Sequence, residues 1–335
     1  MSNRESLSHL SVNRRQLFQA AAGAAGALAL PGVVTAAGGS ETTAPLGAEP
    51  AEKAALKGNI NHSVVTWCFE PHWDFETLCK SARELGCKSV ELCPPDSWAT
   101  VKKYGLTCAI SPSHLFMQGM NNPKYQDGCL EILRTRIDQC AEHGVKTVIT
   151  FTGYAEESGD WADGKNPDLK KLPPNRPKID PETGATNCVA AFKKIVGYAE
   201  KKKINLAMEM LNSRVTDHPM KGHPGFQGDH IDYCMGIVKG VGSERFGLLF
   251  DLYHVQIMDG DIIRRIHDCG DAIKHVHTAG VPGRGELDDT QEINYPPCMK
   301  ALLKIGYRGF VGHEFIPQRL QPGRGLEQAI QVCDV

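Results

Sequence analysis

The chain has 335 residues, of which 41% are hydrophobic and 23% are charged, and its formal net charge is −2. This length and composition are sufficient for one large globular domain with a buried core. Because the charges are balanced, the composition offers no basic footprint for nucleic acid or for anionic lipid. We therefore expect the partner to be a small molecule.

The N-terminal residues follow the order of a signal peptide. Arg14 and Arg15 precede Leu17 and Phe18, and an Ala/Gly-rich stretch then runs to Leu30, with small residues after it. A charged region, an apolar region and a small-residue site in this order predict export. The paired arginines favour the twin-arginine route to the periplasm. The apolar part is too short and too rich in Ala and Gly for a stable membrane span, and a disordered alanine-rich tail is the alternative.

Three segments are expected along the chain. Residues 1–37 are predicted to be the signal peptide, residues 38–57 a linker of Gly, Ala, Thr and Glu, and residues 58–335 the folded domain. The sequence leaves open whether this domain forms a homo-oligomer.

Twelve cysteines are scattered over the chain, and no Cys-x-x-Cys pair occurs among them. This spacing argues against a zinc ribbon and against a thioredoxin-like redox motif. Many of the cysteines have apolar neighbours, so we expect them to be small buried hydrophobic side chains. So many free thiols fit poorly with an oxidising compartment, although the twin-arginine route exports proteins that are already folded.

The folded domain alternates short β-rich runs with amphipathic helical stretches. Strict alternation implies parallel strands, and eight parallel strands close into a (β/α)₈ TIM barrel. An open, doubly wound α/β sheet is the alternative, but no Gly-x-Gly-x-x-Gly turn follows the first run. The predicted strands are Ile60–Trp67, Ser89–Leu92, Leu106–Ile110, Thr147–Phe151, Asn205–Met210, Gly247–Asp251, Ile273–Thr278 and Gly309–Glu314, and the predicted helices include Phe75–Leu85, Leu130–His143, Val189–Lys202, Ile231–Val241 and Ile262–Cys269.

Two connections between predicted elements are long. Residues 111–124 follow the third predicted strand, and residues 153–186 follow the fourth. Loops of this length inside a compact domain are commonly functional. Both begin at the C-terminal ends of strands, where the active sites of barrels lie, so we expect them to cover a site.

Acidic or imidazole side chains end four consecutive predicted strands: Glu209, Asp251, His277 and Glu314. Any one of them alone could be a salt-bridged surface residue or a hydrogen-bonded core residue. On successive strands they converge on the barrel mouth, where their charges would repel unless a divalent cation offset them. The oxygen-rich set favours Mg²⁺ or Mn²⁺, with Co²⁺ and Zn²⁺ as alternatives.

From Glu209 to Pro317 the chain resembles the hydroxypyruvate isomerase family of the xylose-isomerase-like barrels. The resemblance rests on Met-Glu-Met-Leu-Asn-Ser-Arg, Phe-Asp-Leu-Tyr-His-Val-Gln-Ile-Met-Asp-Gly-Asp, Val-Pro-Gly-Arg, Gln-Glu-Ile-Asn-Tyr-Pro and Gly-His-Glu-Phe-Ile-Pro. It implies that the four strand-end residues bind the metal. Two departures concern the substrate: His277 stands where several hydroxypyruvate isomerases have glutamine, and Met210 replaces a more usual proline.

The resemblance implies proton transfer between adjacent carbons, most simply the interconversion of hydroxypyruvate and 2-hydroxy-3-oxopropanoate. Glu209 and Glu314 would remove and return the proton through an enediolate. Arg284 offers a bidentate fork for a substrate carboxylate or oxyanion. His254 would hydrogen-bond a substrate hydroxyl, or else orient the metal-binding carboxylate near it. His114 is expected to line the opposite rim of the site.

Three other functions stay open at this point. A ketose 3-epimerase or another sugar isomerase would use the same metal and the same two glutamates. An exported barrel that binds a sugar acid without turnover would also keep the ligand set. A zinc-dependent apurinic endonuclease on the same fold would need further histidines at the third and fourth strand ends; the third offers His114, but the fourth ends in Phe-Thr-Gly-Tyr.

Overall fold

The computed structural model describes residues 55–157, 175–218 and 220–335. The predicted signal peptide and most of the predicted linker lie outside the described residues, as does part of the second long connection. The described residues belong to one unit that begins at residue 54.

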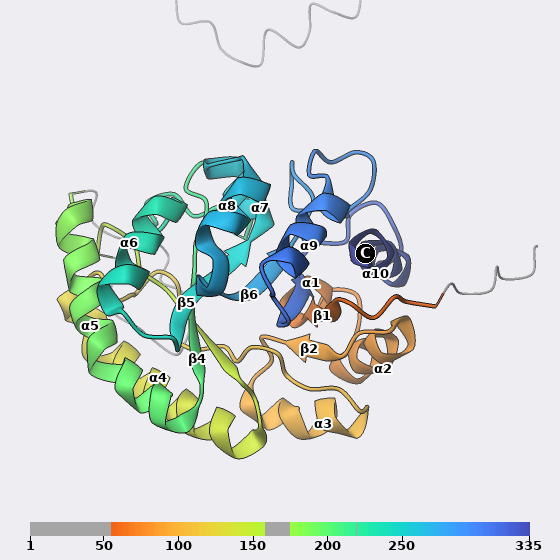
Figure 1. Ribbon diagram of the computed structural model, residues 1–335, viewed down its shortest axis with the longest axis horizontal. Helices are drawn as coiled ribbons and strands as arrows, with labels where there is room; N and C mark the ends of the chain where they lie inside the picture. The colour runs from red at the N-terminus through yellow and green to blue at the C-terminus, as the bar shows by residue number, and fades with distance from the viewer. Residues whose placement is uncertain (1–54, 158–174, 219) are drawn as a thin grey trace, which may run out of the picture. The chain divides into compact units, whose positions relative to one another are not determined.

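Seven parallel strands form the central sheet, in the order β2-β1-β7-β6-β5-β4-β3, and helices surround it on the outside (Figure 1). This arrangement is the α/β barrel that the alternation of elements predicts, so the open, doubly wound alternative is wrong. The strands are β1 (Asn61–Val65), β2 (Ser89–Glu91), β3 (Thr147–Thr150), β4 (Asn205–Glu209), β5 (Phe246–Asp251), β6 (Ile273–Thr278) and β7 (Phe310–His313).

The prediction of a regular strand at Leu106–Ile110 is wrong. Thr107 forms an isolated parallel bridge with β2, and Ser111 forms one with β3. The carbonyl of Thr107 accepts a hydrogen bond from β2 at 3.1 Å, and the amide of Ser111 donates one to β3 at 2.9 Å. Because the segment pairs with its two neighbours at different residues, no ladder longer than one bridge forms. The segment nevertheless joins the two edges of the sheet and closes the barrel.

The helices lie where the sequence predicts them, and two of them are longer than expected. The two long ones begin at a proline that follows an Asx cap, which places their first turns inside stretches that the sequence assigns to loops. The helices are α1 (Thr66–Phe69), α2 (Phe75–Leu85), α3 (Trp98–Lys103), α4 (Pro123–His143), α5 (Pro181–Lys202), α6 (Ile231–Val241), α7 (Leu252–Met258), α8 (Ile262–Cys269), α9 (Tyr295–Lys304) and α10 (Pro322–Cys333).

Local chemistry explains where these helices begin and end. The Asp74 side chain accepts from the Thr77 amide at 2.7 Å and caps the start of α2. At the other end of α2, Gly86 has a φ of 97°, a left-handed conformation that glycine adopts without a steric cost. Asp180 caps α5 in the same way, by accepting from the Thr183 amide at 2.9 Å.

The core fills the space between the sheet and the helices as well as the barrel interior. Every residue of β3 and of β5 is buried, as expected for parallel strands that are covered on both faces. All twelve cysteines are free and buried, which confirms their predicted role as small buried side chains. Between helix and sheet, the rings of Phe192 and Phe246 lie 4.4 Å apart.

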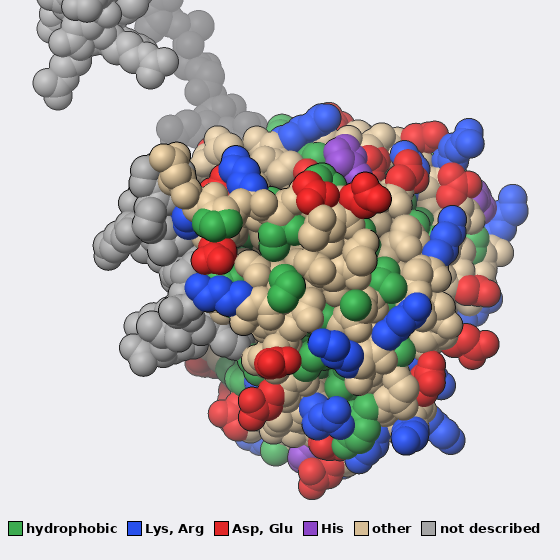
Figure 2. All heavy atoms as spheres, turned by 90° about the vertical axis from the view of Figure 1, so that its left-hand side faces the viewer, with side chains coloured by type: hydrophobic (Ala, Val, Ile, Leu, Met, Phe, Trp, Pro, Cys, Tyr) green, Lys and Arg blue, Asp and Glu red, His purple; other side chains and the backbone are tan. Residues whose placement is uncertain are grey.

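The face on the side of α5 carries mixed charge. Figure 2 shows Lys and Arg side chains interspersed with Asp and Glu around a largely uncharged centre. This face therefore presents no continuous basic stripe of the kind that binds a phosphate backbone. In the part of the chain that the structure describes, no helix has the length and apolar character needed to cross a bilayer.

Candidate active site

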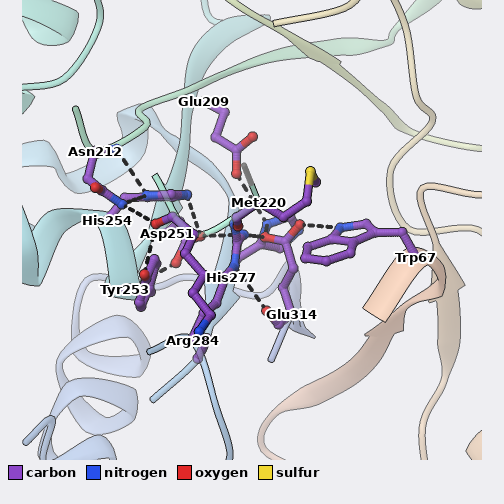
Figure 3. A network of polar contacts seen from close by, with 12 residues as sticks. Trp67, Glu209, Asn212, Met220, Asp251, Tyr253, His254, His277, Arg284 and Glu314 are labelled. Atoms are coloured by element: carbon purple, nitrogen blue, oxygen red, sulfur yellow. Dashed lines mark hydrogen bonds and ion pairs between the residues drawn. The ribbon is translucent and has the colours of Figure 1, made fainter. Parts of the chain in front are cut away.

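The four predicted metal ligands lie together at the C-terminal ends of the strands (Figure 3). Glu209 ends β4, Asp251 ends β5, His277 is the penultimate residue of β6 and Glu314 directly follows β7. One nitrogen or oxygen atom from each lies within 4.8 Å of the corresponding atoms of the others, and all four residues are buried. We call these four residues the quartet.

Two cationic side chains contact the carboxylate of Glu314. Arg284 Nη2 lies 2.5 Å and His277 Nδ1 lies 2.6 Å from Glu314 Oε2. Trp67 Nε1 donates a hydrogen bond to the other oxygen, Oε1, at 2.8 Å. Burial alone would raise the pKa of Glu314, but the charges of Arg284 and His277 outweigh it and lower the pKa to about 2. Glu314 is therefore an ionised carboxylate that is held at both oxygens.

The pKa values of the other two carboxylates of the quartet, Glu209 and Asp251, are raised rather than lowered. Burial raises the pKa of Glu209 to about 7, although the nearby imidazole of His277 opposes the change. Burial likewise raises the pKa of Asp251 to about 6, although the positive charge of Arg284 opposes the change. Three buried carboxylates thus share this site with two cationic side chains, Arg284 and His277, which leaves an excess of negative charge when all three carboxylates are ionised. A divalent cation would remove this imbalance.

The polar atoms of the quartet fit a shared cation. Glu209 Oε1, Glu314 Oε2 and His277 Nδ1 are buried and have ion-pair contacts within the described residues, but none of these contacts has the geometry of a hydrogen bond. His277 Nδ1 nevertheless lies 3.5 Å from Glu209 Oε1 and 2.6 Å from Glu314 Oε2. A buried polar atom left without a partner costs about 1–3 kcal/mol. Three carboxylates and one imidazole nitrogen suit Mg²⁺ or Mn²⁺, and Co²⁺ and Zn²⁺ also accept such a set.

His254 presents a hydrogen-bond donor beside the quartet. The backbone amide of Asn212 donates to His254 Nδ1 at 3.0 Å, which places the ring proton of the neutral imidazole on Nε2. Burial lowers the pKa of His254 well below its ordinary value, so the ring is neutral. Nε2 lies 3.5 Å from Asp251 Oδ2 and has no hydrogen-bond partner among the described residues. The fully buried Nε2–H therefore faces the carboxylate of Asp251.

Arg284 is bound into the site more fully than the sequence suggests. Its Nε donates to the backbone carbonyl of Glu314 at 3.3 Å, and its Nη1 donates to that of Met220 at 2.5 Å. Its Nη2 donates to Asp251 Oδ2 at 3.3 Å, and the guanidinium lies 5.2 Å from the ring centroid of Trp67. Because two carboxylates of the quartet already pair with Arg284, only part of its predicted fork is left for a substrate.

A cavity of about 240 Å³ opens beside the quartet. Glu209, Glu314 and Arg284 line one part of it, and residues 112–116 of the first long connection line another. This connection is therefore part of the site wall, as its length and position suggest. The remaining lining is mostly apolar or aromatic, so the cavity suits a small ligand that is fixed by a few polar contacts.

His114 lines this cavity, as predicted, but the protein engages both of its ring nitrogens. Nε2 lies 2.8 Å from the hydroxyl of Thr150, and Nδ1 lies 3.1 Å from two backbone carbonyls of its own loop. Burial lowers the pKa of His114 to about 4, so the ring is neutral. These bonds leave no ring nitrogen for a substrate, and His114 instead holds the loop against β3.

Three residues near the site escape the sequence analysis. Trp67 ends the predicted strand Ile60–Trp67 but is an indole that lies in α1 of the structure, and His223 lies in the connection after β4, so neither is an acidic or imidazole residue at a strand end. His223 is buried, lines the cavity and has no hydrogen-bond partner for Nδ1 within the described residues. Glu91 does end a strand, β2, and the signal that identified the quartet could have identified it too.

Comparison with known proteins places the chain in a family. A family model described as a xylose isomerase-like TIM barrel matches residues 79–334. A putative hydroxypyruvate isomerase from Homo sapiens is 36% identical over 111 residues, which are 33% of this chain and 38% of that protein. A 2-oxo-tetronate isomerase from Pectobacterium atrosepticum is 41% identical over 115 residues, which are 34% of this chain and 41% of that protein. The matched segments thus span only about two fifths of each relative's length.

A solved structure extends the likeness over most of the chain. The crystal structure of an AP endonuclease, family 2, from Brucella melitensis matches with a TM-score of 0.63 and 24% identity. The match covers 80% of this chain and 97% of that one. At this identity the likeness shows a shared fold.

Proposed function

The chain belongs to the xylose isomerase-like TIM barrel family, and we propose that it is a divalent-metal-dependent isomerase of small hydroxy-carbonyl acids or sugars. The observation that carries the proposal is the buried quartet, with two of its carboxylates, Glu209 and Glu314, lining a cavity of about 240 Å³. Segments of the chain are also similar to proteins named as isomerases of small oxo acids.

Each member of the site has a distinct part in this reaction. The quartet would hold the metal, which when bound polarises a substrate carbonyl and acidifies the neighbouring C–H. Glu209 and Glu314 remove the proton from one carbon and return it to the next through an enediolate of the substrate, while the hydroxyl proton passes to the former carbonyl oxygen. His254 donates a hydrogen bond from Nε2 to a substrate oxygen. Arg284 and Trp67 keep Glu314 ionised and oriented for proton transfer.

The substrate we favour is hydroxypyruvate, interconverted with 2-hydroxy-3-oxopropanoate. The small cavity and the guanidinium of Arg284 at its wall suit a short, anionic molecule. The strand-end stretches from Glu209 to Pro317 that resemble hydroxypyruvate isomerases support the same class.

A ketose 3-epimerase is the second candidate, because His277 occupies a position where several hydroxypyruvate isomerases have glutamine. Both reactions use the same metal and the same two glutamates, so the substrate contacts must separate them. A barrel that only binds a sugar acid, without turnover, is the third reading, and it predicts binding with no product.

A substrate screen separates these candidates. Purified protein with Mn²⁺ is incubated with hydroxypyruvate and with a panel of ketoses, and NMR follows product formation. We expect Glu314→Gln to lower kcat by about 10²–10⁴-fold, while Glu142→Gln on the exposed side of α4 serves as the matched control. Equal turnover in wild type and Glu314→Gln would contradict the two-glutamate mechanism.

We also propose export by the twin-arginine route, on the basis of Arg14 and Arg15 before the Ala/Gly-rich stretch. Replacing both arginines by lysine should retain the protein in the cytoplasm, as read by cell fractionation. Unchanged periplasmic recovery of that variant would exclude the route.

A further inference from the structure

Glu91 is a buried carboxylate that the reaction above does not use. It ends β2, and its side chain is fully enclosed. Its Oε1 lies 2.8 Å from Nε2 of His275 and 2.8 Å from Nε2 of His277. Both histidines belong to β6, and two other strands, β1 and β7, separate β2 from β6 in the sheet. The contact therefore crosses the interior of the barrel.

This contact determines which nitrogen of His277 faces the quartet. Without a metal the neighbouring carboxylates keep His277 protonated and raise its pKa, but a metal-binding imidazole must lose one proton. With Nε2–H donating to Glu91, the proton that is lost is the one on Nδ1. Nδ1 is the atom that lies 3.5 Å from Glu209 and 2.6 Å from Glu314. Of the two ring nitrogens, the one with a free lone pair thus points at the place where the carboxylates converge.

The surroundings leave Glu91 little room to move. His275 lies two residues before His277, on the same side of β6, and supplies a second donor to the same oxygen. On β7, a Cβ added at Gly312 would lie 2.2 Å from Glu91 Oε1 and 2.9 Å from His277 Cδ2. A glycine is thus needed where the Glu91 side chain passes. Glu91, His275 and His277 also bring one possible ligand atom each within 4.8 Å of one another, but both imidazole nitrogens lie 2.8 Å from Glu91 Oε1, the distance of direct hydrogen bonds.

We propose that Glu91 is a positioning residue: through Nε2 of His277 it fixes the ring so that Nδ1 serves as the metal ligand. The proposal rests on the metal site proposed above. Among the described residues, the hydrogen bonds of the Glu91 side chain are to His275 and His277 and to no other member of the quartet, and Glu91 does not line the cavity. Its effect on the metal must therefore pass through His277. Carboxylate partners of this kind typically contribute 10–100-fold to metal affinity.

The test measures Mn²⁺ binding to the full-length protein by calorimetry. We expect Glu91→Gln to raise the Kd for Mn²⁺ about 10–100-fold, because a neutral amide replaces the charged carboxylate and forms weaker hydrogen bonds with the imidazole N–H groups. Glu142→Gln, on the exposed side of α4, should bind like wild type. With Co²⁺ as a probe, the visible absorption of Glu91→Gln should differ from that of wild type, since the orientation of the imidazole ligand changes; a purely structural role predicts an unchanged spectrum.

The outcomes separate this inference from the proposed function. If wild type binds Mn²⁺ and Glu91→Gln binds it equally tightly with the same Co²⁺ spectrum, the positioning role is overturned and the metal site stands. If wild type binds no divalent metal, the metal site and this inference both fail. Should Glu91→Gln not fold, Glu91→Asp carries the test, because it keeps the buried charge but withdraws it by one methylene; unchanged Mn²⁺ affinity in Glu91→Asp would again overturn the proposal.

Discussion

Replacing Gly312 by alanine tests the packing on which the Glu91–His277 contact depends. A Cβ at this position would lie 2.2 Å from Glu91 Oε1, 2.8 Å from Glu91 Cδ and 2.9 Å from His277 Cδ2. Both neighbours are fully buried, so neither side chain can move into solvent. Overpacking of this kind costs about 1–3 kcal/mol. Because His277 must shift as well, the Kd for Mn²⁺ should rise by about 10-fold or more.

The assay has two parts, with a glycine control for each. The unfolding midpoint of the metal-free protein measures stability, and calorimetry measures Mn²⁺ affinity. Gly236 lies on the exposed side of α6, and a Cβ there meets nothing within 4 Å, so Gly236→Ala should stabilise the protein by about 0.5–1 kcal/mol and leave the Kd unchanged. A Gly312→Ala protein with the stability and the Mn²⁺ affinity of wild type would refute this reasoning.

Three further predictions concern the site and the thiols. Trp67→Phe removes the donor to Glu314 Oε1, and steady-state kinetics should show kcat lowered by roughly 10–100-fold, whereas an unchanged kcat would show that the bond is dispensable. Arg284→Ala should lose most activity on hydroxypyruvate, and full activity of this variant would exclude an acid substrate bound by Arg284. All twelve cysteines are buried, so Ellman's reagent should react slowly with the thiols of the native protein and should titrate all twelve once denaturant unfolds it. Rapid reaction of several thiols in the native state would contradict their burial.

The sequence predicts most of the barrel because its strands and helices have strong, local signals. The exception is Leu106–Ile110, which has the composition of a strand. Its backbone hydrogen bonds are divided between β2 and β3, and which strands a segment pairs with is decided by the tertiary fold. The apolar periodicity of α4 begins only at Leu130, so it does not predict that the helix starts at Pro123. The proline and its Asx cap were the available signal.

The quartet could be predicted because parallel strands bring their C-terminal ends to one edge, so four strand-end residues must meet there. The partners of Arg284 could not be predicted, since they depend on loop conformation and on a backbone carbonyl, that of Met220. The hydrogen bonds of His114 likewise depend on the conformation of its own loop, which the sequence does not predict. Glu91 carried the strand-end signal, but its partners on β6 lie across the barrel, and only the fold reveals that distance.

Among the described residues, the ends of β3 and of the segment before it do not supply the histidines that an endonuclease site of three metals needs. The C-terminal end of β3 continues as Phe151 to Tyr154 without a histidine. At the neighbouring segment, His114 is engaged by Thr150 and by backbone carbonyls. The likeness to an AP endonuclease structure at 24% identity therefore extends to the fold alone.

The most direct test of the central claim is a metal titration of the stripped protein. Mn²⁺ is added to metal-free enzyme with hydroxypyruvate in D₂O, and NMR follows the isomeric product and deuterium at the carbon that exchanges its proton. We predict no turnover without metal and a rate that saturates near one ion per chain, with deuterium in the product. Full turnover in the metal-free protein, or no product from hydroxypyruvate or any ketose at saturating Mn²⁺, would contradict the account.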